Sequence, residues 1–321
     1  MKIGLLGAGY LGSELIQVLS AGHSITALDH GRHYENILRL PIMHKKDVTL
    51  MKGDITRKKD LEKLAEKCDV LINLTGGGGN AACTKDPKAY VDTYVIGTRL
   101  LADTAEKFGI RHIFHSSTIS VYPAITGNSA KPLDESVPPG PATIYGVLKL
   151  ASERILEEHS VNYTILRLSN IYGYTSIHAL PEGGFMGNAI RSVFRRTPIQ
   201  IHGTGYQKID YIHISDVCNC FRLLLDQQFE KKAVYNIGSG TPMTLTELAD
   251  LILRIAKTDF DIRGDKDLVP YEGPVIDYPQ MSIEKITKEC GWLPQVILSD
   301  GLEDVMEKYH KEMMPCEHTS P

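Results

Sequence analysis

The sequence lacks a long apolar segment of the kind that a membrane-spanning helix requires. None of its apolar runs approaches the roughly 20 residues that cross a bilayer, and the opening residues MKIGLLGAG have no signal-peptide anatomy. An excess of basic residues is also missing, since 35 Lys and Arg stand against 39 Asp and Glu, which gives a net charge of −4. These absences predict a cytoplasmic protein that binds neither membranes nor nucleic acid.

Metal-binding and disulfide patterns are missing too. The six cysteines include no CxxC pair, and the twelve histidines include no HExxH motif. Cys218 and Cys220 fall inside an apolar helical run, which favours buried free thiols in a reducing compartment. We therefore expect no metal site. Internal repeats and low-complexity segments are absent, and the ordinary globular composition predicts about two domains.

What the sequence does contain is a regular alternation of apolar runs and helical segments as far as residue 170. Strands that are apolar on both faces and alternate with helices indicate a doubly wound parallel sheet, a Rossmann-type α/β fold. Beyond residue 170, loops, short strands and a capped helix predict a smaller C-terminal lobe that covers the substrate. The predicted strands of the sheet are 2–6, 24–29, 48–54, 69–76, 111–117 and 162–168.

A glycine-rich turn follows the first predicted strand. The sequence GAGYLG places Gly7, Gly9 and Gly12 in the pattern GxGxxG, and Asp29 ends the second strand seventeen residues after Gly12. In a dinucleotide-binding fold the first glycine permits a tight turn, the second admits the pyrophosphate, and the third packs the helix on the strand. The N–H groups of the following helix then face the pyrophosphate. The pattern predicts a dinucleotide cofactor.

Asp29 bears on the choice of cofactor. A carboxylate at this position accepts hydrogen bonds from the adenosine ribose and repels a 2′-phosphate, which favours NAD over NADP. His30 and Arg32 follow closely, and an arginine accommodates such a phosphate. We expect NAD, with NADP as the less favoured alternative. The expected NAD-binding domain comprises residues 1–169 and about 209–237; residues 170–208 and 238–312 form the substrate-binding lobe, and 313–321 form a frayed tail.

Hydroxyl-bearing side chains end the fifth predicted strand, at the sheet edge where open α/β folds bind ligands. The segment HSSTISVYP ends this strand, and Tyr145 and Lys149 follow it, four residues apart. Taken alone, such a pair is equally typical of a surface helix. On a helix, however, the two side chains share one face, so the ammonium can lower the pKa of the phenol from its usual value of about 10.

Together these motifs resemble the extended short-chain dehydrogenase/reductase family, the NAD-dependent epimerases and dehydratases of nucleotide sugars. The resemblance covers nearly the whole chain and keeps the family's order of segments. Besides GxGxxG and YxxxK, it rests on GDITRKKDL, IGTRLLADTAEKFGIRHIFHSS, LRLSNIYG, DYIHISDV, YNIGSGTPMTLTELA and ECGWLP.

The resemblance implies roles for individual residues. Tyr145 would exchange a proton with the substrate, Lys149 would lower the pKa of Tyr145 and hold the nicotinamide ribose, and Thr118 would hydrogen-bond the reacting oxygen. A homodimer through a four-helix bundle is also implied, with helices that start near Lys88 and Ile144. The implied cofactor-binding residues are Gly7, Gly9, Tyr10, Leu11, Gly12, Asp29, Asp54, Ile55, Leu74, Thr75, Gly76, Tyr145 and Lys149, and the implied substrate contacts are Thr118, Ser120, Asn170, Arg196 and Arg263.

The chain departs from the family at several positions. Family dehydratases carry Asp-Glu after the catalytic Ser or Thr, to protonate a leaving hydroxyl and remove a neighbouring proton, whereas this chain has Ile119 and Ser120. Dehydration is therefore disfavoured. Tyr94 replaces the asparagine of the usual NVIGT, and GGGGN at 76–80 replaces the commoner AA segment.

Both arginines that grip a substrate phosphate in the family are missing. Ile209 stands in YQKID where the family has GQxRD, and Glu272 or a neighbour stands at the later RPGD position. Because phosphate charges buried without cations are costly, we expect another arginine to replace the clamp, with Asn170 helping. The candidates are Arg191, Arg195, Arg196 and Arg263.

The expected activity is that of a nucleotide-sugar epimerase or 4-ketoreductase, and the same three catalytic residues serve both. The missing arginines keep open a dehydrogenase or reductase of a non-nucleotide polyol or keto substrate. A non-catalytic NAD(P)-binding sensor protein is a further alternative. It would need the glycine turn but not the acid–base pair, so the presence of Tyr145 and Lys149 counts against it.

Overall fold

The computed structural model describes residues 1–31, 34–124, 132–175, 177, 180, 184–227, 231–270 and 280–313. The strands of the central sheet are β1 (Lys2–Leu6), β2 (Ser24–Asp29), β3 (Val48–Lys52), β4 (Val70–Asn73), β5 (His112–Thr118), β6 (Asn162–Leu168) and β11 (Ala233–Ile237). They form a seven-stranded sheet in the order β11-β6-β5-β4-β1-β2-β3, and all neighbours are parallel. The order reverses between β1 and β4, as in a doubly wound fold, which confirms the predicted fold class.

All six predicted apolar runs form strands of this sheet, and β11 is a seventh strand at its edge. The predictions for 48–54 and 69–76 ran too far at their carboxyl ends, because β3 ends at Lys52 and β4 ends at Asn73. The residues that follow leave the sheet and form loops at the edge where the glycine turn lies. The Leu74 N–H still donates to the Leu6 carbonyl at 2.9 Å, which keeps the loop after β4 beside that turn.

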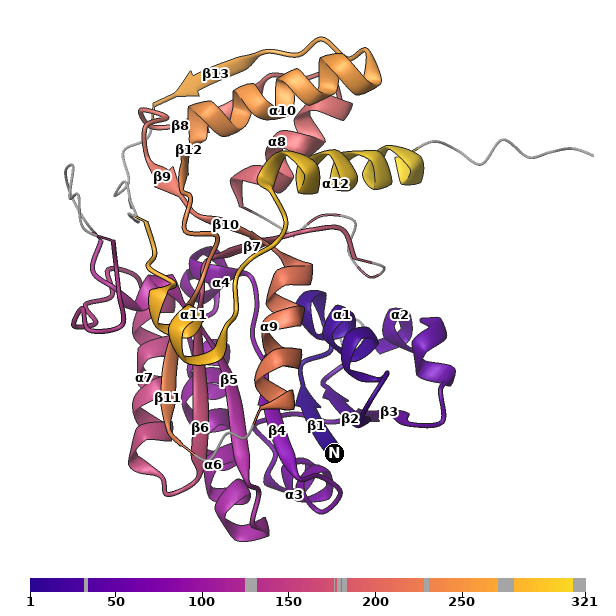
Figure 1. Ribbon diagram of the computed structural model, residues 1–321, viewed down its shortest axis with the longest axis vertical. Helices are drawn as coiled ribbons and strands as arrows, with labels where there is room; N and C mark the ends of the chain where they lie inside the picture. The colour runs from indigo at the N-terminus through magenta and orange to yellow at the C-terminus, as the bar shows by residue number, and fades with distance from the viewer. Residues whose placement is uncertain are drawn as a thin grey trace, which may run out of the picture.

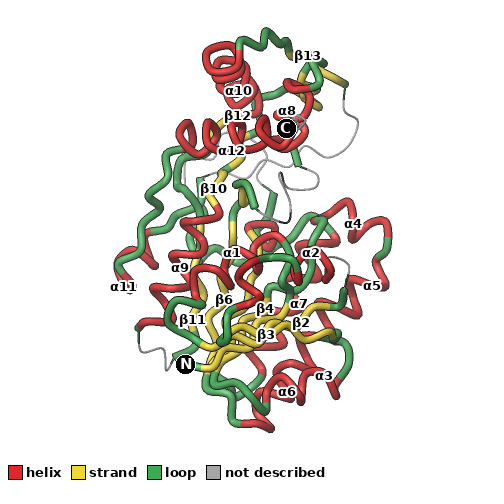
Figure 2. Tube along the Cα trace, turned by 90° about the vertical axis from the view of Figure 1, so that its right-hand side faces the viewer, coloured by secondary structure: helices red, strands yellow, loops and turns green. Residues whose placement is uncertain are grey.

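Helices cover both faces of the sheet (Figures 1 and 2). On one face α1 (Tyr10–Leu19), α2 (Tyr34–Leu38) and α9 (Ile214–Asp226) bury apolar side chains in one hydrophobic core. On the other face α3 (Lys58–Ala65), α6 (Gly97–Phe108) and α7 (Ile144–Glu158) contribute to a second core. The remaining helical segments around the sheet are α4 (Gly79–Lys85), α5 (Pro87–Val91), the π-helical turn η2 (Asp92–Ile96), the 3₁₀ turns η1 (Pro41–His44) and η3 (Ile119–Val121), and α11 (Glu284–Cys290).

A smaller lobe lies beyond the sheet and has its own hydrophobic core (Figure 1). Helix α10 starts from a capping box in which Thr244 and Glu247 satisfy each other's backbone N–H groups. The substrate-binding role of this lobe and the expected domain boundaries stay predictions. The elements of the lobe and its connections are β7 (Asn170–Tyr172), α8 (Phe185–Phe194), β8 (Ile199–His202), β9 (Lys208–Ile209), β10 (Tyr211–His213), β12 (Met243–Thr244), α10 (Leu245–Phe260), β13 (Lys266–Val269) and α12 (Leu298–Met313).

Several expectations based on absent motifs concern the whole chain. In the part that the structure describes, no helix combines the length and the apolarity needed to cross a bilayer. Among these described residues, no group of three or more His, Cys, Asp or Glu side chains is arranged to hold a metal ion. Cys218 and Cys220 are buried in α9. The expected tail lies outside the described residues except for Met313, and the cytoplasmic location stays a prediction.

Candidate active site

The glycine-rich turn joins β1 to α1 at the carboxyl edge of the sheet. Gly7 has a φ of 89°, which only glycine adopts without strain. A Cβ on Gly12 would lie 2.1 Å from the Gly7 carbonyl oxygen, so the helix packs directly on the turn. By contrast, a Cβ on Gly9 would meet no described atom within 4 Å. Helix α1 has no side-chain cap at Gly9, so its first N–H groups face this open side and can receive an anion.

Asp29, at the end of β2, holds the turn in place. Its Oδ2 accepts a hydrogen bond from the Ala8 N–H at 3.0 Å, and its Oδ1 accepts one from the Gly31 N–H at 3.0 Å. A carboxylate has about four lone-pair sites, so both oxygens retain the capacity to accept hydrogen bonds from ribose hydroxyls. Arg32, which the sequence offered as a partner for a 2′-phosphate, lies outside the described residues.

The other expected cofactor-binding residues surround this turn. The Tyr10 hydroxyl donates to the Gly173 carbonyl at 2.7 Å, which fastens the start of α1 to the loop after β7. Asp54 accepts hydrogen bonds from the N–H and the hydroxyl of Thr56, both at 2.8 Å. Leu11 is half-buried in α1, Ile55 is buried, and Leu74, Thr75 and Gly76 follow β4 directly.

Lys149 is buried in α7, with 4% of its surface exposed. Its Nζ donates a hydrogen bond to the Ser116 carbonyl at 2.6 Å. Burial lowers the pKa of Lys149 from 10.5 to about 8, while the Glu153 carboxylate and the Cys83 thiol act in the opposite direction. The ammonium form therefore predominates at neutral pH, although water does not solvate it freely.

Tyr145 lies one turn before Lys149, at the start of α7, and is half-buried. The helix begins here because the Thr143 hydroxyl oxygen accepts the Gly146 N–H at 3.1 Å as an N-cap. A Cβ on Gly146 would lie 2.1 Å from the Ser120 carbonyl oxygen, so α7 packs closely on η3, which Thr118 caps. The fold thus brings Thr118, Tyr145 and Lys149 together at the same edge of the sheet.

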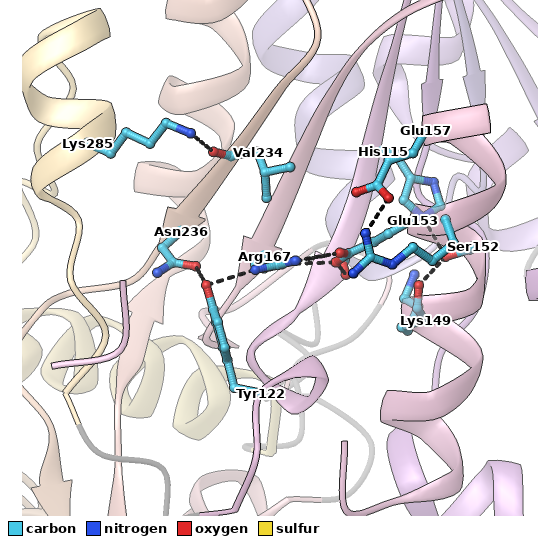
Figure 3. A network of polar contacts seen from close by, with 12 residues as sticks. His115, Tyr122, Lys149, Ser152, Glu153, Glu157, Arg167, Val234, Asn236 and Lys285 are labelled. Carbon is cyan, nitrogen blue, oxygen red and sulfur yellow. Dashed lines mark hydrogen bonds and ion pairs between the residues drawn. The ribbon is translucent and has the colours of Figure 1, made fainter. Parts of the chain in front are cut away.

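A buried ion pair supports this part of α7 (Figure 3). Glu153, one turn after Lys149, is fully buried, and Arg167 on β6 donates to its carboxylate through Nε at 3.1 Å and Nη2 at 2.7 Å. Arg167 also donates to the Tyr122 hydroxyl at 3.0 Å, and that hydroxyl donates to Asn236 at 2.8 Å. Sequence reasoning missed this network, because its members come from four separate elements and form no linear motif.

Ser120 and Asn170 are the two uncharged polar residues, besides Thr118, that the resemblance assigned to the substrate. Ser120 is half-buried, and its N–H donates to the Thr118 hydroxyl oxygen at 3.2 Å. Asn170 is exposed, and its amide group donates to the Asp210 carbonyl at 3.3 Å. The Asp210 carboxylate itself is buried and accepts the Ser239 N–H at 2.9 Å.

Residues 5–238 match the family described as the NAD dependent epimerase/dehydratase family. The chain belongs to this family. Among curated relatives, the dTDP-glucose 4,6-dehydratase of Streptomyces niveus is 26% identical over 316 residues, covering 94% of this chain and 90% of that protein. The UDP-glucose 4-epimerase of Rhizobium meliloti is 28% identical over 321 residues, covering 91% of this chain and 92% of that protein.

Solved structures of similar enzymes have the same fold. The UDP-glucuronic acid 4-epimerase of Bacillus cereus, solved with UDP-glucuronic acid and NAD, is 24% identical and superimposes with a TM-score of 0.85, covering 97% of this chain and 100% of that one. The UDP-glucose 4-epimerase of Thermotoga maritima, solved with UDP-glucose, is 23% identical with a TM-score of 0.84, covering 98% and 100%.

The epimerase/dehydratase family includes dehydratases, but the turn after Thr118 has no carboxylate for that chemistry. Ile119 is 3% exposed and packs in a small apolar cluster with Val121 and Tyr122. Ser120 carries only a hydroxyl group. A hydroxyl titrates far too high to remove a proton from carbon at neutral pH without a partner base, so these two residues do not supply the acid–base pair that the family's dehydratases carry at this turn.

The arginines proposed as a replacement clamp lie in the smaller lobe. Arg196 follows α8 and Arg263 precedes β13, and both are exposed. Their segments are joined by a hydrogen bond from the Ile199 N–H to the Asp265 carbonyl at 2.8 Å. Strands β8 and β13 pair with each other and lie at the far end of the lobe from α7 (Figure 1).

Proposed function

We propose that the protein is an NAD-dependent nucleotide-sugar epimerase or 4-ketoreductase. The observation that carries this proposal is the placement of Tyr145 one turn before the buried Lys149, on a helix packed against the Thr118 turn. Family membership and the nucleotide-sugar enzymes named above support it. None of those relatives supports a polyol dehydrogenase or a non-catalytic sensor protein.

The glycine turn fits a dinucleotide. Gly9 leaves open space beside the uncapped start of α1, where backbone N–H groups would hold the pyrophosphate. Asp29 would accept hydrogen bonds from the adenosine ribose, and its charge favours NAD over NADP. NAD bound in this way supplies the chemistry that a side chain cannot, namely acceptance and donation of a hydride.

The chain's own residues would transfer the proton to and from the substrate. Tyr145 would take the proton of the sugar 4-hydroxyl as the C–H bond breaks, and would return it when the keto group is reduced. The Lys149 ammonium would stabilise the phenolate between these steps. The Thr118 hydroxyl oxygen already accepts the Ser120 N–H at 3.2 Å, so its own hydrogen is left to donate to the reacting oxygen.

Epimerisation and ketoreduction need the same three residues, so substrates must separate them. An epimerase would interconvert a UDP- or dTDP-hexose and its 4-epimer without net consumption of NAD, which NMR of the sugar protons would record. A reductase would oxidise NADH only when a 4-keto nucleotide sugar is added. If neither reaction occurs across a panel of such substrates, the nucleotide-sugar function is wrong.

We also propose that two chains pair through α5–α6 and α7. Four large apolar side chains on these segments are exposed: Val91 at 38%, Ile96 at 48%, Ile144 at 38% and Val147 at 46%. Pairing these helices with those of a second copy would bury this surface in a four-helix bundle. Sedimentation equilibrium should give twice the chain mass, and Val147→Glu should shift the protein toward the monomer, whereas Leu268→Glu, at an exposed residue of β13, should not.

A further inference from the structure

Tyr94 is a large buried side chain in the π-helical turn η2, between α5 and α6. Only 2% of its surface is exposed. A π-helical turn within a longer helix is rare and often marks a functional site. Tyr94 belongs to a small apolar cluster with Cys83 and Leu148, and this cluster borders Tyr145. A residue that the sequence showed only as a departure from the family therefore lies against the catalytic helix.

The ring of Tyr94 faces both members of the catalytic pair. Lys149 Nζ lies over this ring, 4.6 Å from its centroid. The centroids of the Tyr94 and Tyr145 rings are 6.0 Å apart, with their planes tilted by 59°. The first distance is within the range of a cation–π interaction, which is strongest where the cation is desolvated. Tyr94 thus contacts the same Nζ that donates to the Ser116 carbonyl.

Gly76 and Gly77 hold the other end of the Tyr94 side chain. A Cβ on Gly76 would lie 2.3 Å from the Tyr94 hydroxyl oxygen, so a side chain at this position and the phenol exclude each other. The φ of Gly76 is 111°, which also requires glycine. The backbone of Gly77 lies close enough to this hydroxyl to lower its pKa, against the larger effect of burial, which raises it. The Tyr94 phenol therefore packs against the first glycines of the GGGGN segment, in space that a side chain at position 76 would fill.

We propose that Tyr94 is a positioning residue whose ring face stabilises the Lys149 ammonium and holds Nζ beside Tyr145. The catalytic meaning of this contact rests on the proposed function, but the contact can be tested without any substrate. The ring is an uncharged partner, so it stabilises the cation without forming a tight ion pair that would compete with Tyr145 for the ammonium.

The other charged and titratable groups around Lys149 are compatible with stabilisation of its ammonium group by the Tyr94 ring. Glu153 is shared with Arg167, which holds it through two nitrogens. Burial lowers the pKa of His115 well below its usual value and raises the pKa values of Cys83 and Tyr94, so these three are neutral near pH 7. The titratable groups near Lys149 include Tyr145 and Glu153 on α7, His115 on β5, Cys83 on α4 and Tyr94 on η2.

The pKa of Lys149 can be measured directly by NMR of protein labelled with ¹³Cε-lysine, with Lys149→Met assigning the signal. Tyr94→Leu removes the ring and should lower this pKa by about one unit. Tyr94→Phe keeps the ring and should leave it within about 0.3 units, because the hydroxyl does not face the ammonium. Equal pKa values in wild type, Tyr94→Leu and Tyr94→Phe would overturn the proposal.

A second series covers the case in which Tyr94→Leu does not fold. Phenylalanine with one, two or three ring fluorines at position 94 keeps the shape of the side chain while it progressively weakens the negative face of the ring. The pKa of Lys149 should fall stepwise with each fluorine, and a flat series would overturn the proposal. If the series falls as expected but no nucleotide sugar is turned over, the role of Tyr94 stands and the proposed function fails.

Discussion

Glu153 on α7 and Arg167 on β6 form a buried ion pair that joins the helix to the sheet, with 2.7 Å between Oε2 and Nη2. Because Arg167 would remain buried without its partner, Glu153→Leu should destabilise the protein by about 3–5 kcal/mol. Urea unfolding measures this loss. The double variant Glu153→Leu/Arg167→Met removes both charges and should recover part of it. A single variant as stable as wild type would show that the pair contributes nothing to the fold.

An ion pair on the protein surface provides a matched control for the buried Glu153–Arg167 pair. Arg99 and Asp103 on α6 form an ion pair at 3.0 Å, but both side chains are largely exposed. Solvent screening makes such pairs worth about 1 kcal/mol or less. Asp103→Ala also loses a hydrogen bond to His159, so Arg99→Ala is the cleaner control. Its effect on urea unfolding should be much smaller than that of Glu153→Leu.

Asp29 should make the protein prefer NAD to NADP. Asp29→Ala removes the acceptor for the ribose hydroxyls, so affinity for NAD should fall by about tenfold or more. It also removes the charge that repels a 2′-phosphate, so the difference between the affinities for NAD and NADP should become smaller. Fluorescence titration with NADH and NADPH measures both constants. The variant also loses the Ala8 hydrogen bond, so part of the loss in NAD affinity will come from a looser glycine turn. A wild-type protein that binds NADP more tightly would contradict the prediction.

Tyr145→Phe keeps the aromatic ring and removes the transferable proton. Turnover should therefore fall by about 10²–10⁴, the usual contribution of general acid–base catalysis, while NAD binding should persist. Lys149→Met should reduce both turnover and NAD affinity, because the ammonium serves both the phenol and the ribose. Near wild-type turnover of Tyr145→Phe on the true substrate would rule out the mechanism.

Lys149 gives the protein a distinctive dependence of stability on pH. Its pKa is about 8 in the folded protein and 10.5 in the unfolded chain, so the unfolded state binds more protons between these values. Its buried charge costs stability in full below pH 8, and stability should rise by about 3 kcal/mol from pH 8 to 10.5. Lys149→Met lacks this contribution. The difference between the unfolding free energies of the two proteins should therefore change with pH only in this window.

Six of the seven strands of the sheet could be predicted from the sequence because each is a local apolar run, and the glycine turn because its spacing is local. The Tyr145–Lys149 pair could be predicted for the same reason, since four residues on a helix fix one face. The contact between Tyr94 and Lys149 could not, because it depends on a π-helical turn and on the absence of a side chain at Gly76. The sequence shows the glycine at position 76, but neither the π-helical turn nor the packing of the Tyr94 phenol against that glycine has a sequence pattern of its own.

The position of the arginines relative to the site could not be predicted from the sequence either. The sequence indicated which cations were available for a phosphate clamp, but their distance from the site depends on how the smaller lobe packs. Ile209, which stands where the family has its arginine, packs against the hydrophobic core of that lobe. Arg191 lies on α8, where it donates to Asn188 at 2.8 Å. The structure thus explains where the family cation is missing, and it leaves the choice of a substitute to experiment.

A nucleotide diphosphate nevertheless needs a cationic partner, and this need gives the last prediction. Its two or so negative charges are costly to bury without one, so a nucleotide-sugar enzyme should use at least one arginine of the smaller lobe. Calorimetry with UDP, dTDP, GDP and CDP tests the diphosphate without the sugar. The four variants Arg191→Gln, Arg195→Gln, Arg196→Gln and Arg263→Gln should include one that weakens this binding by about tenfold or more and leaves NAD binding unchanged.

Lys257→Gln on α10 serves as the matched control for lost surface charge, and it should alter neither titration. If wild-type protein binds a nucleotide diphosphate and every arginine variant binds it equally well, the clamp is wrong but the function stands. If wild-type protein binds none of the four even at millimolar concentration, the nucleotide-sugar function is wrong, and the two missing family arginines indicate a substrate without a diphosphate. A smaller polyol or keto compound, which carries no diphosphate to be neutralised, would then be the substrate to test with the same Tyr145→Phe variant.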